Sequence, residues 1–108
     1  MKIEVPLLSA AEVKKMVDGG GDFILLDMRD GKDIKRMGSI KGSLNIVLED
    51  LMVRYNEIPK GKKVVIIDHA GKQVQITGRY LLKQGYTDMA GMEGGMKGGW
   101  VAAGYPVE

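Results

Sequence analysis

The chain has 108 residues and a mass of 11.8 kDa, which is the size of one domain with one hydrophobic core, so we expect a single domain over residues 1–108. Its formal net charge is only +2, and it has one Phe and one Trp, so it lacks the charge and the stacking surface typical of nucleic-acid-binding proteins. No apolar run could span a membrane, and the N-terminus lacks the charged and apolar regions of a secretory signal, so we expect a cytoplasmic chain that binds neither membranes nor nucleic acid.

The first half of the chain predicts alternating helices and strands. Ser9 and Glu12 have the spacing of a capping box, which places the start of a helix directly after Ser9. This helix is expected to end at Asp18, because three consecutive glycines follow. The next expected elements are a buried strand at 23–27, a short helix within 30–37, a turn at 38–43, a strand at 44–46 and a helix at 48–55.

The second half continues the alternation. Residues 63–67 are mostly β-branched and predict the strongest strand of the chain. A helix follows up to Gln84, with a buried stripe expected at Ile76, Tyr80 and Leu81 and with Gly85 as its terminator. The last expected elements are a strand at 87–90 and a short helix that contains Trp100. Strands that alternate with helices predict an α/β domain with a mainly parallel sheet.

The segment between the strand at 63–67 and the next helix is the candidate site. Ligands of open parallel sheets bind beyond the carboxyl ends of the strands. Backbone amides and the dipole of the following helix favour an anion there, so the loop predicts an anion-binding cradle for a small anion or a partner protein. The candidate residues are Asp68, His69, Ala70, Gly71, Lys72, Gln73 and Val74.

The chain contains no cysteine, which excludes disulfides, thiolate metal ligands and every thiol-based mechanism. A single histidine also argues against a His-rich metal site, so we expect no metal and no other cofactor. Met89, Met92 and Met96 have the soft sulfur ligands of a metal site, but we expect them to fill gaps in a glycine-rich core.

Four sequence boxes resemble those of the rhodanese-like family, and they occur in the family's order over residues 9–108. The boxes are LLDMR at 25–29, GSIKGSLNI at 38–46, GY at 85–86 with MEGGM at 92–96, and WVAAGYPV at 100–107. The resemblance implies a mainly parallel five-stranded sheet flanked by helices on both faces. It also implies that Asp27 and Arg29 form an ion pair that supports the active-site end of the sheet. Ser39 departs from the pattern, because the family has a histidine there.

Members of this family carry sulfur on one cysteine at the start of the strand-to-helix loop. Matching the loop glycine to Gly71 places Asp68 where that cysteine stands. His69 and Gln73 then replace two basic residues, and Lys72 is the remaining loop cation. The sulfur-carrying intermediate contains a sulfur–sulfur bond, which a carboxylate cannot form. The resemblance therefore predicts a rhodanese-homology domain without sulfurtransferase activity, either alone or as part of a larger protein.

Two functions remain open for such a domain, beside a third reading in which it is a structural domain whose loop has no function. The first, which we favour, is a binding or regulatory module that uses the loop at 68–74. The second is a hydrolase or phosphatase-like enzyme in which Asp68 is the nucleophile and His69 the general base. A phosphoaspartyl mechanism commonly needs a second carboxylate, which the loop lacks. We therefore expect Asp68 to accept loop amide hydrogen bonds, and His69 to be solvated.

Overall fold

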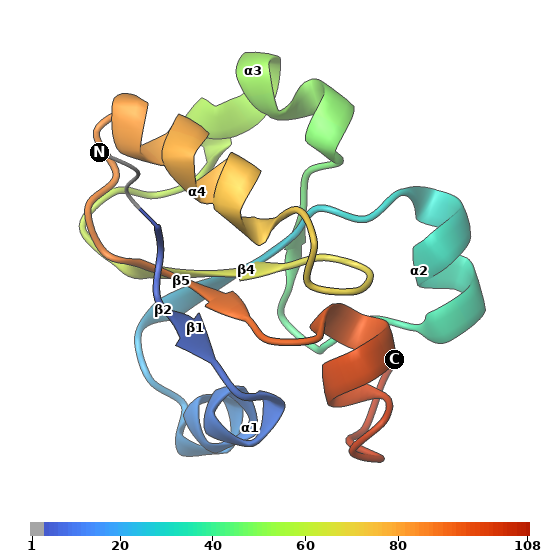
Figure 1. The fold of residues 1–108 in the computed structure, drawn as a ribbon. Helices are drawn as coiled ribbons and strands as arrows, with labels where there is room; N and C mark the ends of the chain where they lie inside the picture. The colour runs from blue at the N-terminus through green and yellow to red at the C-terminus, as the bar shows by residue number, and fades with distance from the viewer. Residues whose placement is uncertain (1–3) are drawn as a thin grey trace.

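The computed structural model describes residues 4–108 and folds them around one five-stranded sheet (Figure 1). The sheet order is β1-β5-β4-β2-β3, and every neighbouring pair of strands is parallel. The expected mainly parallel α/β sheet is therefore confirmed. The strands are β1 (Leu7–Leu8), β2 (Phe23–Asp27), β3 (Leu44–Asn45), β4 (Lys63–Ile67) and β5 (Met89–Met92).

Helices cover both faces of the sheet. Figure 1 shows α3 and α4 over one face, α1 and the C-terminal helical segment under the other, and α2 beside the sheet. The α-helices are α1 (Ala10–Gly19), α2 (Gly31–Met37), α3 (Leu51–Arg54) and α4 (Val74–Lys83). Short 3-10 turns at Leu48–Asp50 and Tyr55–Glu57 flank α3, and the C-terminal segment Gly95–Trp100 is π-helical. None of the helices within residues 4–108 is long and apolar enough to cross a membrane.

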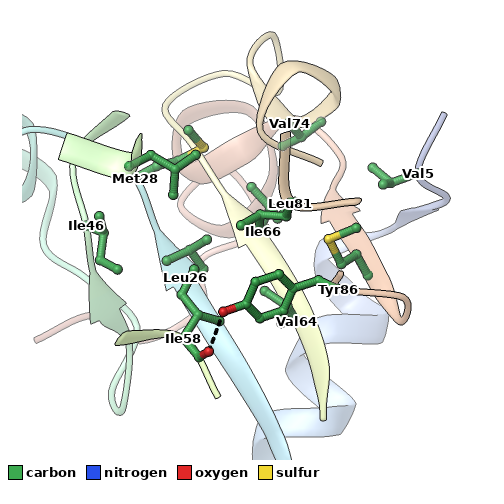
Figure 2. Close-up of a cluster of buried hydrophobic side chains, with 12 residues drawn as sticks. Val5, Leu26, Met28, Ile46, Ile58, Val64, Ile66, Val74, Leu81 and Tyr86 are labelled. Carbon is green, nitrogen blue, oxygen red and sulfur yellow. Dashed lines mark hydrogen bonds between the residues drawn. The ribbon is translucent and has the colours of Figure 1, made fainter. Parts of the chain in front are cut away.

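The two faces of the central strands form two separate cores. Alternate residues of a strand point to opposite faces, so Leu26 and Ile66 pack under α4 while Leu25 and Ile67 pack against α1. Figure 2 shows the first core, where the Tyr86 hydroxyl donates a hydrogen bond of 2.6 Å to the Ile58 carbonyl. The second core contains, from other elements, Val13, Met92, Met96 and Trp100. Buried strands of this kind explain the continuous apolar runs in the sequence.

Local signals determine where most elements begin and end. The Ser9 hydroxyl accepts from the Glu12 amide, and the Glu12 carboxylate accepts from the Ser9 amide, so the capping box is confirmed. The helix ends at Gly19, one residue later than expected, and Gly20 caps it in the left-handed conformation. Gly85, at φ 94°, terminates α4, one position beyond the cap residue Gln84.

Three expectations about elements were wrong. Ile76 is 57% exposed, and the buried residues of α4 are Val74, Thr77, Gly78 and Leu81. The last strand is Met89–Met92, two residues later than expected, because its partners are Val64, Val65 and Ile66 of β4 and the edge strand β1. The helix expected at 48–55 is a four-residue α-helix between two 3-10 turns, and its Met52 is exposed.

Candidate functional site

A pocket of about 380 Å³ opens beyond the carboxyl ends of β2 and β4. One wall is α2, the second is the segment at 47–49, and the third is the loop between β4 and α4. This is the place where an open parallel sheet is expected to bind a ligand. The lining residues are Met28, Arg29, Asp30, Lys32, Asp33, Arg36, Val47, Leu48, Glu49, Asp68, His69 and Gln73.

Asp68 follows β4 directly, and its carboxylate lies inside its own loop. One oxygen, Oδ1, accepts the Gly71 amide at 2.6 Å, and the other, Oδ2, accepts the Gln73 amide at 2.7 Å. Gln73 is the residue that precedes α4, so the carboxylate ties the end of β4 to the start of the helix. Only 2% of Asp68 is exposed. The amide hydrogen bonds expected from the sequence are therefore present, and the carboxylate itself fills the cradle.

Close backbone contacts hold this loop on the C-terminal segment. The Met96 and Lys97 amides donate to the Asp68 and His69 carbonyls, each at 2.9 Å. Gly71 has a φ of 83° and packs on the backbone of Gly94. Gly95 has a φ of 61°, and a Cβ atom there would lie 2.7 Å from the Asp68 Oδ1. Glycine is required at these two positions, both for the left-handed backbone and for the lack of space.

Arg29 and Asp27 form a bidentate ion pair at the end of β2. The Arg29 Nη2 lies 2.7 Å from the Asp27 Oδ2, and its Nε lies 3.0 Å from the Oδ1. Each side chain is only 1% exposed. Burial acts to lower the pKa of Arg29, but hydrogen bonds and attraction to Asp27 and Asp33 outweigh it and raise the pKa. The ion pair expected for these residues is present, and Nη2 also donates to the Gly38 carbonyl at 2.8 Å.

Asp33 links this ion pair to the loop. Its Oδ2 lies 3.4 Å from the Arg29 Nη1 and 3.0 Å from the His69 Nδ1. We expected His69 to be solvated, and this was wrong, because a carboxylate from α2 orients its ring. No signal in the sequence identified Asp33, which lies 36 positions before His69. Its place in the first turn of α2, after the cap residue Asp30, is the only local indication of its position.

The loop residues do not all face the pocket. Asp68, His69 and Gln73 line it, whereas Val74 is 1% exposed in the core beneath α4. Ala70, Gly71 and Lys72 are absent from the pocket lining. Within residues 4–108, no three His, Cys, Asp or Glu side chains come together as metal ligands. Met89, Met92 and Met96 are buried in the two cores, where they contribute to packing.

The arrangement restricts the chemistry open to the pocket. The Asp68 carboxylate is engaged on both oxygens, so a nucleophilic attack by it would require breaking amide hydrogen bonds. Because Nδ1 of His69 faces Asp33, Nε2 is the nitrogen that can meet a ligand. The pocket thus offers polar recognition groups and an oriented imidazole, and the chain supplies no thiol.

Comparisons with known proteins agree with this architecture. A sulfurtransferase from Allochromatium vinosum is 31% identical over 86 residues, which are 80% of this chain and 78% of that protein. The YrkF protein of Bacillus subtilis is 27% identical over 93 residues, which are 86% of this chain and 50% of that protein. This chain therefore spans about half of that relative's length.

Two solved structures share the fold over nearly the whole chain. A rhodanese-related protein from Thermoplasma volcanium has a TM-score of 0.84 and 25% identity, covering 95% of this chain and 97% of that one. A protein of unknown function from Rhodopseudomonas palustris, described as a possible tyrosine phosphatase, has a TM-score of 0.86 and 26% identity, covering 96% and 85%. The family model of the rhodanese-like domain matches residues 9–103. The chain belongs to the rhodanese-like domain family.

Proposed function

We propose that this rhodanese-like domain does not transfer sulfur and acts as a binding or regulatory module through the pocket beside the loop at 68–74. The observation that carries the proposal is the carboxylate of Asp68, which stands where the family's cysteine is expected and is held by two loop amides. Sulfur transfer needs a polarisable thiolate that forms a sulfur–sulfur bond, and no residue of this chain supplies one.

The geometry also supports binding over turnover. The loop is locked by amide hydrogen bonds to Asp68 and by two backbone hydrogen bonds from the C-terminal segment. A fixed polar pocket of about 380 Å³ is within the size range of ligand-binding sites. The partner classes that suit it are a small anion or an acidic part of another protein, in a chain that stands alone or belongs to a larger protein.

The second candidate is a hydrolase or phosphatase-like enzyme that uses Asp68 and His69. The pairing of His69 with Asp33 favours it, because a carboxylate commonly orients a histidine that acts as a general base. The description of the Rhodopseudomonas palustris relative as a possible tyrosine phosphatase points the same way. The engaged oxygens of Asp68 count against it.

Two turnover assays test this choice. The binding module predicts no thiosulfate:cyanide sulfur transfer above buffer and no hydrolysis of an aryl phosphate. Turnover of the aryl phosphate that scales with protein concentration and is lost in His69→Gln would establish the hydrolase. Sulfur transfer that scales with protein concentration would refute the inactive domain altogether. Heteronuclear NMR with a panel of small acids and peptides then tests binding, and shifts must gather at the residues that line the pocket.

A further inference from the structure

The loop amides are not available to an external anion in this chain. Asp68 occupies the amides of Gly71 and Gln73 at 2.6 and 2.7 Å, and it lines the pocket. An incoming anion would have to displace a buried carboxylate and would meet its charge at close range. An anionic partner must therefore be recognised by other groups of the pocket.

Arg29 and His69, which both line the pocket, already have partners. Arg29 is bound to Asp27 and Asp33 and donates to the Gly38 carbonyl, so its donors face inward. His69 is bound to Asp33. Arg29 holds the pocket walls together and cannot serve a ligand without breaking that network, and His69 can offer a ligand only its Nε2.

Lys32 and Arg36 are the exception. They lie one turn apart on α2, both line the pocket, and both are exposed. Within the described part of the chain, residues 4–108, neither lies within 4.0 Å of a carboxylate oxygen. Like charges four positions apart on a helix repel each other, so an anion that approaches both side chains reduces this repulsion. Among the described residues, the two cations have no ion-pair partner on the α2 wall, in a lining that also holds the carboxylates of Asp30 and Glu49.

Resting on the proposed binding function, we propose that the pocket binds an acidic peptide segment of a partner protein, with carboxylates of the segment on Lys32 and Arg36. Exposed ion pairs are individually weak, so a small acid would gain little from two such cations. A peptide can add apolar contacts. The opposite wall at 47–49 leads along the chain into α3, whose Met52 and Val53 lie outside the pocket lining and are 73% and 81% exposed.

Heteronuclear NMR titration of the whole chain tests this assignment. The probe is an end-blocked peptide of two glutamates, one leucine and three glycines. The controls are the same peptide with glutamines in place of the glutamates, and succinate. We expect saturable amide shifts at residues 32–36 and 47–53 with the glutamate peptide, binding at least about tenfold weaker for the glutamine peptide, and weaker binding of succinate.

A matched pair of variants on α2 identifies the cations. The double variant Lys32→Glu, Arg36→Glu should lower the affinity for the glutamate peptide at least about tenfold, because two attractions become repulsions. Lys35→Glu reverses one positive charge in the last turn of the same helix, outside the pocket. It should leave the affinity for the glutamate peptide within about twofold.

Several results would overturn the assignment. They are equal binding of the glutamine peptide, succinate binding as tight as the peptide, shifts centred on the Gly71 and Gln73 amides, no saturable shift, or equal loss in Lys35→Glu. In each of these cases an absence of sulfur transfer and phosphate hydrolysis would still stand. The failure would then concern the acidic peptide as the ligand. The proposed binding module fails instead if turnover is found, or if no member of the wider panel shifts the residues that line the pocket.

Discussion

Two amide hydrogen bonds fix the carboxylate of Asp68 in a place where a thiolate or an external anion could otherwise sit. A carboxylate there satisfies loop amides that would be left without partners, and its charge interacts favourably with the start of α4. A carboxylate cannot carry a sulfur atom as a thiolate does. Under the proposed function, one side chain therefore stabilises the loop and takes the place of the sulfur-carrying group.

Replacing Asp68 by alanine should destabilise the protein by about 0.5–2 kcal/mol at neutral pH, the range for lost helix caps. Asp68→Asn keeps the shape but turns one acceptor into an amide donor that faces a backbone N–H, so it should also be destabilised. Urea unfolding monitored by circular dichroism measures both changes. Stability equal to or above that of the wild type would mean that the carboxylate is strained in its loop.

Replacing Asp68 by cysteine should give a readily ionised thiol but a poor sulfurtransferase. Loop amides at a helix N-terminus commonly lower cysteine pKa values to between about 3.5 and 7.5. Thiolate absorbance against pH measures that pKa in the variant. Positioned charges commonly contribute about 10²–10³-fold in rate, and His69 and Gln73 replace the family's basic residues.

Adding His69→Arg and Gln73→Arg to this cysteine variant should therefore raise its thiosulfate turnover. An ordinary thiol pKa in Asp68→Cys would show that the side chain does not face the loop amides. Strong turnover from the single variant would show that the cations are dispensable.

At the scale of elements, the turn between β5 and the π-helical segment packs against the loop at 68–74 through Gly95. Gly95→Ala should cost more than about 2 kcal/mol, because an L-residue at its φ of 61° is strained and its Cβ would meet the Asp68 carboxylate. Gly98→Ala is the matched control in the same segment, since no atom lies within 4 Å of its Cβ position. It should be neutral or stabilise by about 0.4–1 kcal/mol. Thermal unfolding measures both variants. If they lose the same stability, the effect comes from the helical segment and not from the contact between Gly95 and the loop.

Elements with strong local signals could be predicted from the sequence, and elements set by tertiary pairing could not. The capping box at Ser9 and the β-branched strand β4 are local properties of the chain. β1 has only two residues and exists because Leu7 and Leu8 pair with Gly91 and Met92. A two-residue edge strand leaves no periodic pattern to detect.

The candidate site shows the same division. The loop at 68–74 was located from its place after a buried strand, and the Asp68 hydrogen bonds are short-range within it. The role of α2 in the pocket could not be predicted, because Asp33 meets His69 only after the sheet has brought distant segments together. Ile76 illustrates the converse error, since an apolar residue at a plausible spacing faces solvent.

At the scale of the whole molecule, a chain of polar contacts joins the sheet, α2 and the loop at 68–74. It runs from Asp27 through Arg29 and Asp33 to His69, with successive oxygen–nitrogen distances of 2.7, 3.4 and 3.0 Å. The inner members are buried, while His69 is half-exposed, so the inner pair carries most of the interaction energy. The pocket geometry therefore depends on Arg29, which is 4% exposed.

Arg29→Ala should destabilise the protein by about 3–5 kcal/mol, because it leaves the buried Asp27 carboxylate without its cation. It should also loosen α2, since the bonds to Asp33 and the Gly38 carbonyl are lost with it. The double variant Asp27→Leu, Arg29→Met removes both charges and should recover part of the loss, since a buried pair often exchanges for apolar groups at little cost. Denaturant unfolding of the three proteins gives the free energies, and amide hydrogen exchange in α2 reports its loosening. If the double variant is no more stable than Arg29→Ala, the stabilisation comes from the contacts of Arg29 to α2. If Arg29→Ala loses less than about 1 kcal/mol, the end of the sheet does not depend on the ion pair for its stability.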